Sequence, residues 1–217
     1  MTRRHPLRHL PTILMLCAVL FAALPADASE APARRGRASW YSDDLHGKKT
    51  ASGEAYDLNA LTAAHKTLPL GTVVRVTNLA NGRSVLVTVN DRGPYRGNRD
   101  IDVSYSAAKQ LGIVKPGSAA VRIEVMGDAK GRPLDPDSAY FVRIRSYASK
   151  AEAERLVRKL EREGEAAARV RARVEDGRKR WMVCVGPFRD FDDARALRRH
   201  LMQRHADIDI VADRARD

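Results

Sequence analysis

The stretch that decides the fold is TVVRVTNLANGRSVLVTVND, Thr72 to Asp91. Valines alternate with more polar residues on both sides of Asn81-Gly82, a dipeptide that favours tight turns. Two alternating runs joined by such a turn are typical of a β-hairpin. The second run ends at Asp91, which the turn-forming sequence RGP follows. Asp91 is therefore either part of a turn or a carboxylate placed at a strand end for chemistry.

The segments that follow this hairpin predict a small β-rich domain. Ser104 is suited to cap a short helix over YSAAKQL, and Gly112 is suited to its left-handed end. The run AAVRIEVM, Ala119 to Met126, alternates again and predicts a closing strand. Several short strands with one or two short helices favour a β-barrel, which we expect over residues 37–127 after a short lead at residues 29–36.

The first 28 residues predict a secretory signal peptide. A basic start precedes the apolar run Ile13–Leu24, and small residues lead to a cleavage point after Ala28. The run is shorter than the about 20 residues that span a bilayer, so we expect export and no membrane segment after cleavage; an anchor is the alternative. Leu16 before Cys17 argues against lipidation. Cleavage leaves Cys184 as the only cysteine, which excludes an internal disulfide and to which the sequence assigns no role.

The formal net charge of +12 is spread along the chain. In an intracellular protein such a charge would suggest nucleic acid as a partner. For an exported protein, an anionic cell envelope is the expected environment, with much of the charge on solvated faces. We therefore expect no nucleic-acid partner.

An internal repeat follows a linker at residues 128–138. Phe141–Leu160 aligns without gaps to Met182–Leu201, an offset of 41 residues (182 − 141). Each copy predicts a strand, a turn and an amphipathic helix, and a further strand-like run follows each. The repeat therefore predicts a βαββαβ domain over residues 139–214, with both helices on one face of its sheet.

Strand alternation assigns the two faces of that sheet. The residues expected to face the helices are Val142, Ile144, Val183 and Val185. Those expected on the other, open face are Phe141, Arg143, Arg145, Met182 and Cys184. An open face with an aromatic ring and two arginines suits an extended ligand, and a merely solvated face fits the pattern equally well.

Three residues of the first domain could carry chemistry if its loops converge on one cleft. They are Glu54, His65 and Asp91, two carboxylates and an imidazole from separate segments. The chain contains no HExxH, GxSxG or Walker sequence. A zinc site from His46, His65 and Asp91 lacks recognisable ligand spacing. We expect no metal and no cofactor.

The segment from Gly36 to Met126 resembles the RlpA family (rare lipoprotein A, septal-ring lytic transglycosylases). The motifs that carry this resemblance are TASGE, TAAHKTLP, VTNL-NGR and NDRGP. The repeat domain resembles SPOR domains, best at VCVGPF, Val183 to Phe188. The resemblance implies a chain that is mainly β plus α+β: a double-psi β-barrel followed by a βαββαβ, ferredoxin- or RNP-like SPOR domain.

The same resemblance implies an exported lytic transglycosylase. Such enzymes cleave MurNAc–GlcNAc β-1,4 bonds of peptidoglycan, preferably in strands that lack stem peptides, and leave 1,6-anhydro ends during cell-wall remodelling and daughter-cell separation. The implied location is the periplasm of a Gram-negative bacterium, without lipidation and enriched at the division septum. The implied partners are glycan strands and division-site proteins. The alternative is a non-catalytic, expansin-like protein that binds peptidoglycan.

The family motifs imply a role for each candidate residue. Asp91 would be the acid/base, Glu54 would stabilise positive charge at the anomeric carbon or tune Asp91, and His65 would orient a carboxylate or the substrate. The roles of Glu54 and Asp91 can be exchanged. Further cleft contacts are expected from Tyr41, Arg92 and Tyr95. Glycan contacts in the repeat domain are expected from Arg143, Arg145, Ser146 and Trp181, although arginines stand at 143 and 145 where SPOR domains frequently have glutamine and glycine, and Ser42 replaces a common glycine.

Overall fold

The computed structural model describes residues 33–217 except 165–166, 176, 207 and 216–217. The predicted signal peptide, residues 1–28, lies outside the described residues. Among the residues described, no helix is long and apolar enough to cross a membrane.

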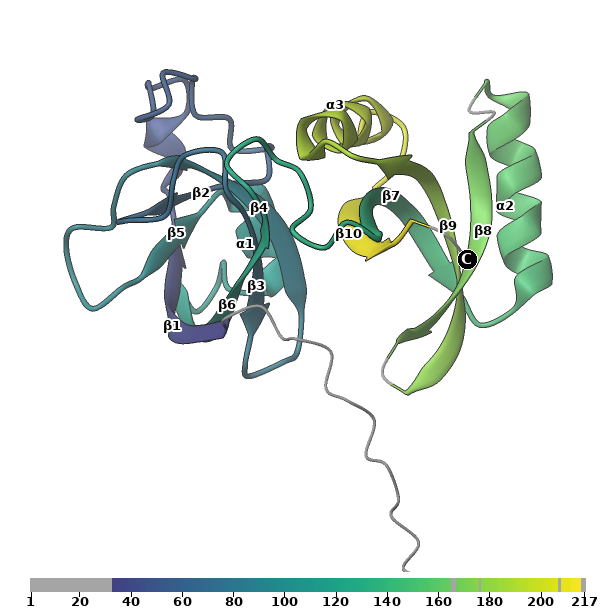
Figure 1. Ribbon diagram of the computed structural model, residues 1–217, viewed down its shortest axis with the longest axis horizontal. Helices are drawn as coiled ribbons and strands as arrows, with labels where there is room; N and C mark the ends of the chain where they lie inside the picture. Colours follow the sequence, from purple (N-terminus) through teal and green to yellow (C-terminus); the bar gives the residue numbers. More distant parts are fainter. Residues whose placement is uncertain (1–32, 165–166, 176, 207, 216–217) are drawn as a thin grey trace, which may run out of the picture. The chain divides into compact units, whose positions relative to one another are not determined.

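Six strands form a closed barrel in the order β1, β5, β2, β4, β3, β6 (Figure 1). Antiparallel pairing of β1 with β6 closes it, while β1 with β5 and β2 with β4 run parallel. The strands are β1 (Ala33–Trp40), β2 (Thr62–His65), β3 (Val73–Asn78), β4 (Ser84–Asp91), β5 (Ile101–Val103) and β6 (Ser118–Gly127), with a 3-10 turn η1 (Asp43–Leu45) and helix α1 (Tyr105–Leu111) between them.

The local predictions for the barrel are confirmed. Gly82 has a φ of 71° in the loop between β3 and β4, which pair antiparallel. The alternating valines of both strands are buried in the core. Strand β1 begins at Ala33, before the predicted domain start at residue 37, because its backbone pairs with β6 across an exposed basic run that has no apolar alternation.

The predicted caps of α1 are also confirmed. The Ser104 hydroxyl accepts a hydrogen bond from the Ala107 backbone N–H and donates one of 2.6 Å to the Ala60 carbonyl. Gly112 ends the helix in the left-handed conformation, with a φ of 72°. The helix is thereby tied to the loop that precedes β2.

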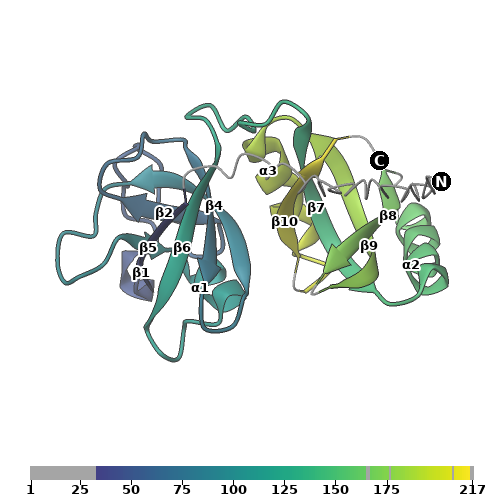
Figure 2. The same ribbon diagram turned by 60° about the horizontal axis from the view of Figure 1, so that its bottom comes forward.

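The C-terminal domain has the predicted βαββαβ order. Its elements are β7 (Ser138–Tyr147), α2 (Lys150–Arg162), β8 (Ala168–Glu175), β9 (Arg178–Phe188), α3 (Phe191–Leu201) and β10 (Asp209–Arg214). The sheet order is β10, β7, β9, β8 (Figure 2). Val142, Ile144, Val183 and Val185 share one hydrophobic cluster with Ala153, Leu160, Ala194 and Leu201 of the helices, which confirms the predicted helix-facing side.

The other face of this sheet is less open than the alternation predicts. Phe141, Met182 and Cys184 do lie together on it, but each is fully buried. The Arg171 guanidinium of β8 lies 4.3 Å from the Phe141 ring centroid, an arrangement that a cation–π contact favours. The prediction of an accessible aromatic ring on this face is therefore wrong, because arginine side chains of β8, which lies beyond β9 in the sheet, cover the ring.

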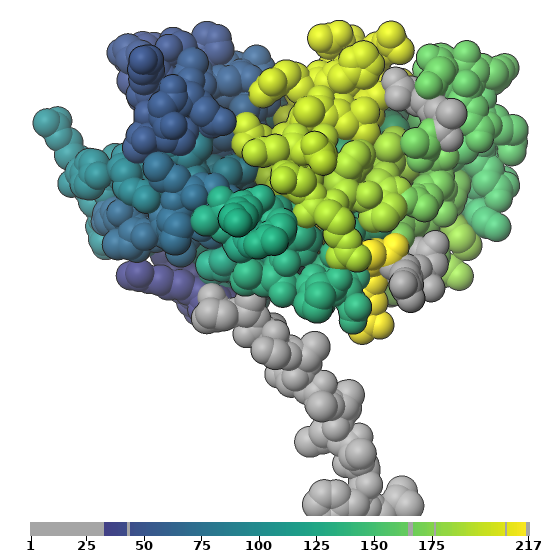
Figure 3. All heavy atoms as spheres, turned by 45° about the horizontal axis from the view of Figure 1, so that its top comes forward, coloured from purple at the N-terminus to yellow at the C-terminus, as the bar shows by residue number. Residues whose placement is uncertain are grey.

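Helix α3 also contacts the barrel. Arg198, only 3% exposed, donates hydrogen bonds to the Asn59 carbonyl (3.1 Å) and the Ser106 hydroxyl (2.9 Å) of the barrel, and to the Ile208 carbonyl (2.8 Å) of its own domain. Atoms of α3, yellow-green, meet those of the barrel, blue, in Figure 3. Burial lowers the pKa of Arg198 to about 10, which still leaves the guanidinium charged at neutral pH.

Replacing Arg198 should destabilise the protein. Arg198→Met removes three donated hydrogen bonds, among them the one to the buried Ser106 hydroxyl, so we expect a loss of about 3 kcal/mol in the free energy of unfolding. Urea unfolding of the mature chain measures it. The matched control is Arg199→Met, since the Arg199 guanidinium is exposed and lies 3.9 Å from Asp57, a pair worth about 0–1 kcal/mol. Equal losses in both variants would contradict the role of Arg198.

Candidate active site on the barrel

Four adjacent strands each place one residue in a row on the barrel wall, and three of these residues are polar. The strand register aligns Ser39 of β1 with Asp102 of β5, Asp102 with Ala64 of β2, and Ala64 with Asp91 of β4. Residues in register point to the same face of a sheet, so the side chains of Ser39, Asp102 and Asp91 lie on one side of the wall. In this register Ala64 stands between the two aspartates. We call Ser39, Asp102, Ala64 and Asp91 the carboxylate row.

A register shift brings Asp91 into this row. Ala63 pairs with Val89, whereas the next residue, Ala64, pairs with Asp91, so Asn90 is the extra residue of a bulge. Without the bulge, Asp91 would share the face of Val89, which is buried in the core. The bulge therefore turns the carboxylate out of the barrel interior.

Three donors hold the Asp91 carboxylate. The backbone N–H groups of Ala51 and Arg92 each donate to Oδ1 at 2.8 Å, and the Tyr41 hydroxyl donates to Oδ2 at 2.9 Å. These donors come from three different segments. The orientation of the carboxylate is thus determined by the fold and not by solvent.

Glu54 is tied to the same strand end. Asn90, the bulge residue, donates from Nδ2 to Glu54 Oε2 at 3.0 Å, and its own carbonyl accepts from the Ser52 N–H at 3.0 Å. Together with the bond from Ala51 to Asp91, these contacts fasten the TASGE loop along the end of β4. The structure therefore brings Glu54 and Asp91 to one place, with Glu54 exposed to solvent.

The Tyr41 hydroxyl interacts with the carboxylates of Asp91 and Asp102. Its ring packs against Tyr56 with 4.9 Å between centroids. Burial, above all, raises the pKa of the Tyr41 hydroxyl, and the hydrogen bond to Asp91 and the charges of Asp91 and Asp102 raise it further. Tyr41 therefore stays protonated and acts as a donor to Asp91.

Asp102 is a candidate site residue that sequence reasoning missed. It is 8% exposed, accepts a 2.7 Å hydrogen bond from Ser39 Oγ, and lies 3.2 Å from the Arg99 guanidinium. Burial raises the pKa of its carboxyl, an effect that the Ser39 hydrogen bond and the positive charge of Arg99 oppose. The available signal was an acid between two β-branched residues in DIDVS, because alternation places that acid on the outer face of a strand.

His65 is held by its own chain. Its Nδ1 accepts hydrogen bonds from the backbone N–H groups of Thr67 (3.2 Å) and Leu68 (3.0 Å), which assigns the proton to Nε2. Burial, above all, lowers the pKa of the imidazole, and nearby cations including Arg34 add to this. Within the described residues, no hydrogen bond links His65 to Asp91. Its role towards substrate stays a prediction.

The other predicted cleft residues, Arg92 and Tyr95, differ in their contacts and in their exposure to solvent. The Arg92 guanidinium donates to the His65 carbonyl at 3.3 Å and so joins the ends of β2 and β4. Tyr95 is 78% exposed beyond the turn at Gly93, whose φ is 130°. Tyr95 is therefore free to meet a ligand, whereas Arg92 supports the frame of the site.

Three of the four predicted glycan-binding residues come together in the C-terminal domain. Arg143, Arg145 and Ser146 line a shallow cavity of about 300 Å³ with Glu175. Glu175 accepts from Arg143 at 2.7 Å and from Ser146 at 3.2 Å, while Arg145 is exposed. The cavity therefore combines a fixed ion pair with the exposed Arg145, whose guanidinium has no ion-pair partner among the described residues.

Trp181 lies elsewhere. It pairs with Tyr147 across β7 and β9 and packs against the helix-side core. Lys179 and Lys150 lie 4.7 Å and 5.6 Å from its ring centroid. Lysines thus occupy the ring faces that a sugar would stack on, and Trp181 does not line the cavity of Arg143.

A closed barrel with a carboxylate row, followed by a βαββαβ domain, defines the class of double-psi barrel proteins that carry a SPOR domain. The family model described as "Lytic transglycolase" matches residues 33–123, and the one described as "SPOR domain" matches residues 136–208. The chain belongs to the RlpA family. The predicted double-psi β-barrel and SPOR domain are thereby confirmed.

Several curated relatives of similar sequence carry one common name. The endolytic peptidoglycan transglycosylase RlpA of Neisseria meningitidis serogroup A is 45% identical over 154 residues, 70% of this chain and 64% of the relative. That of Vibrio cholerae is 41% identical over 167 residues, 75% of this chain and 62% of the relative. That of Campylobacter jejuni is 59% identical over 92 residues, 42% of this chain and 34% of the relative. The chain thus spans less than two thirds of the length of these relatives.

Proposed function

We propose that this protein is an exported lytic transglycosylase that cleaves MurNAc–GlcNAc β-1,4 bonds of peptidoglycan and leaves 1,6-anhydro ends. The observation that supports it most is the convergence of Asp91 and Glu54 at the end of β4, beside the carboxylate row. The names of the relatives agree with this activity.

The proposed chemistry needs one group that both donates and accepts a proton. The glycosidic oxygen leaves with a proton from the acid, and positive charge develops at the anomeric carbon. The C6 hydroxyl of the same MurNAc residue then bonds to C1 and loses its proton to the same group. The C1–O4 bond breaks, the C1–O6 bond forms, and no water is consumed.

We assign the acid/base role to Asp91. Its two oxygens are positioned by three donors, and Tyr41 presents its hydroxyl to one of them. Glu54, exposed and held by Asn90, would stabilise the positive charge at C1. Asp102 would add a fixed negative charge on the same wall, and the Nε2 of His65 would donate to the substrate.

The SPOR domain would bind glycan strands that lack stem peptides. The cavity of Arg143, Arg145 and Ser146 supports this role, because guanidinium and hydroxyl groups can donate to sugar oxygens. We further propose the periplasm of a Gram-negative bacterium as the location, without lipidation and enriched at the division septum. Division-site proteins would be its partners.

Digestion of sacculi tests the activity. The purified mature chain is incubated with sacculi stripped of stem peptides by an amidase, and the released fragments are analysed by mass. We expect fragments that carry anhydro ends, in larger amounts than from untreated sacculi. Absence of anhydro ends, with binding retained, would instead support the expansin-like alternative.

The exposed Arg145 should contribute to glycan binding without contributing to stability. We expect Arg145→Ala to weaken binding to amidase-treated sacculi about threefold to tenfold, because one donor at the edge of the cavity is lost. A pull-down titration measures it. Arg155→Ala, which removes an exposed arginine of α2, is the matched control and should bind like the original chain. Equal binding by both variants would remove Arg145 from the glycan site.

A further inference from the structure

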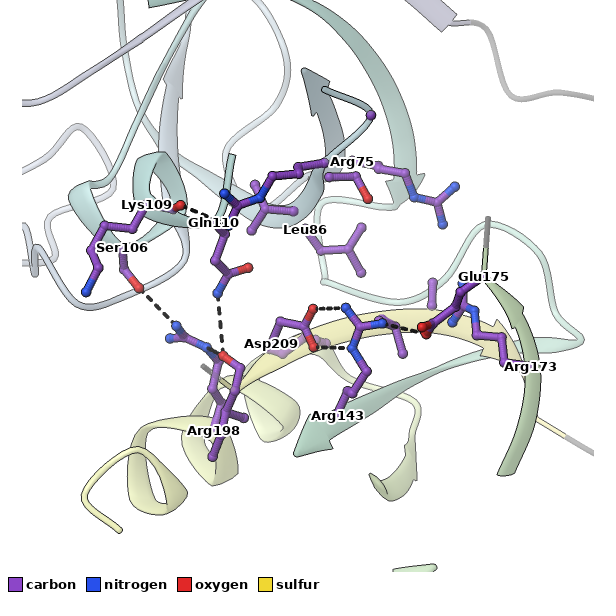
Figure 4. A pocket seen from close by; sticks show the side chains of 18 of the residues that line it. Arg75, Leu86, Ser106, Lys109, Gln110, Arg143, Arg173, Glu175, Arg198 and Asp209 are labelled. Atoms are coloured by element: carbon purple, nitrogen blue, oxygen red, sulfur yellow. Dashed lines mark hydrogen bonds and ion pairs between the residues drawn. The ribbon is translucent and has the colours of Figure 1, made fainter. Parts of the chain in front are cut away.

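A second cavity, of about 660 Å³, lies between the barrel and the SPOR domain. Its walls come from the β3–β4 hairpin and α1 on one side and from β7, β8 and β10 on the other (Figure 4). The cations that line it are Arg75, Arg83, Lys109, Arg143, Arg173 and Arg198. We call it the Arg75 cavity.

The Arg75 cavity is separate from the carboxylate row. It touches β4 at Ser84, Val85 and Leu86, whereas the catalytic candidate Asp91 ends the same strand. At about 3.3 Å per residue, the nearest of these lining residues, Leu86, is about 16 Å along the strand from Asp91. A ligand in this cavity therefore does not meet the reacting atoms of the proposed cleavage.

Positive charge exceeds negative charge in this cavity. Its acidic lining residues are Glu175 and Asp209, and Arg143 is bonded to both. Figure 4 shows this chain of ion pairs from Asp209 through Arg143 to Glu175. The two carboxylates are thus already engaged by one arginine, and among the described residues the cavity wall holds no further acid for the remaining cations.

Arg75 is the cation whose charge is least satisfied. It is partly buried on β3, yet its guanidinium makes no hydrogen bond or ion pair with any residue in the described part of the chain. Burial, above all, lowers the pKa of its guanidinium; nearby Glu124 opposes this, while the positive charges of Arg173 and Arg122 add to it. A partly desolvated arginine beside like charges is unfavourable unless an anion meets it.

Arg173, on the opposite wall of the cavity, is also incompletely paired. Its Nη1 is buried without a hydrogen bond among the described residues, and it forms only a long ion pair, of 3.8 Å, with Asp213. In Figure 4, Arg75 belongs to the barrel side of the cavity and Arg173 to the SPOR side. One arginine from each domain therefore faces a common space.

We propose that the Arg75 cavity binds a carboxylate, with Arg75 and Arg173 as its donors. Planar guanidinium groups match carboxylate oxygens in geometry and charge. If the proposed function holds, on which the choice of source rests, the carboxylate is the lactyl group of a muramic acid residue that has lost its stem peptide. A cavity of about 660 Å³ has the size that ligands of a disaccharide's dimensions require. The barrel thereby takes part in recognising glycan strands that have lost their stem peptides.

Calorimetric titration of the full mature chain tests the proposal. The probe is the disaccharide GlcNAc–MurNAc, which has the lactyl carboxylate but no MurNAc–GlcNAc bond that could be cleaved. The comparison ligands are chitobiose, which has no carboxylate, and inorganic phosphate, an anion without a sugar. Arg75→Gln is the test variant, and Arg155→Gln, which removes the same charge from exposed α2, is the matched control.

We expect the disaccharide acid to bind the original chain and the Arg155→Gln variant equally, and Arg75→Gln about tenfold more weakly, since one charge-assisted hydrogen bond is lost. Chitobiose should bind the original chain at least about tenfold more weakly than the disaccharide acid does. Equal binding by Arg75→Gln, or equal binding of chitobiose, would overturn the proposal, and binding of phosphate but not of the disaccharide would overturn the assignment to a wall carboxylate. Failure of the chain to cleave sacculi would refute the proposed function instead, because this titration requires no catalysis.

Discussion

Asp91→Asn is expected to lower the release of anhydro-ended fragments about a thousandfold, the size of effect seen when a general acid/base is lost. An amide of the same shape can still accept from the Ala51 and Arg92 N–H groups through its oxygen. It cannot exchange a proton with the glycosidic oxygen. Timed digestion of amidase-treated sacculi, with anhydro ends counted by mass, measures the effect.

Folding and binding should survive this substitution. Thermal unfolding and sacculus pull-down of Asp91→Asn should match those of the original chain, because the amide oxygen can accept both backbone bonds and the amide nitrogen can donate to the Tyr41 hydroxyl oxygen. Asp193→Asn, which changes an exposed acid in α3, is the matched control for the change in charge. Cleavage by Asp91→Asn within a few fold of the original rate would remove Asp91 from the mechanism.

Asp102→Asn should lower the cleavage activity with little effect on stability. We expect cleavage to fall about 10- to 100-fold, because a fixed charge is lost from the wall on which the positive charge of the transition state would develop. The same change should alter the free energy of unfolding by no more than about 1 kcal/mol, since burial raises the pKa of this carboxyl and so already disfavours its charge.

The sign of the pH dependence provides a second readout for Asp102. Because the pKa of its carboxyl is raised in the folded state, its contribution to stability is present at low pH and is lost as the pH rises through the acidic range. Relative to the original chain, the Asp102→Asn variant should therefore become more stable as the pH rises from about 3 to 6. Unchanged cleavage by Asp102→Asn would place Asp102 outside the mechanism.

Local features of both domains could be predicted because they depend on neighbours in sequence. Alternating valines around Asn81-Gly82 predict the β3–β4 hairpin whatever the rest of the chain does. Ser104 and Gly112 predict the ends of α1 for the same reason. The repeat predicts the SPOR topology, since two copies of one pattern fold alike. The motifs around Glu54 and Asp91 predict that these two acids meet, which the bonds at the end of β4 support.

What depends on contacts between distant segments was decided by the tertiary structure alone. No local pattern in β5 says that Asp102 aligns with Ser39 on one side and Ala64 on the other, because register between strands far apart in sequence comes from barrel closure. Nor does alternation in β7 show that Arg171 of β8 covers Phe141. The sequence by itself determined the elements, the two domains and the acids of the motifs. The tertiary structure decided which of these acids share a wall, since side chains from separate strands become neighbours only when the backbone pairs.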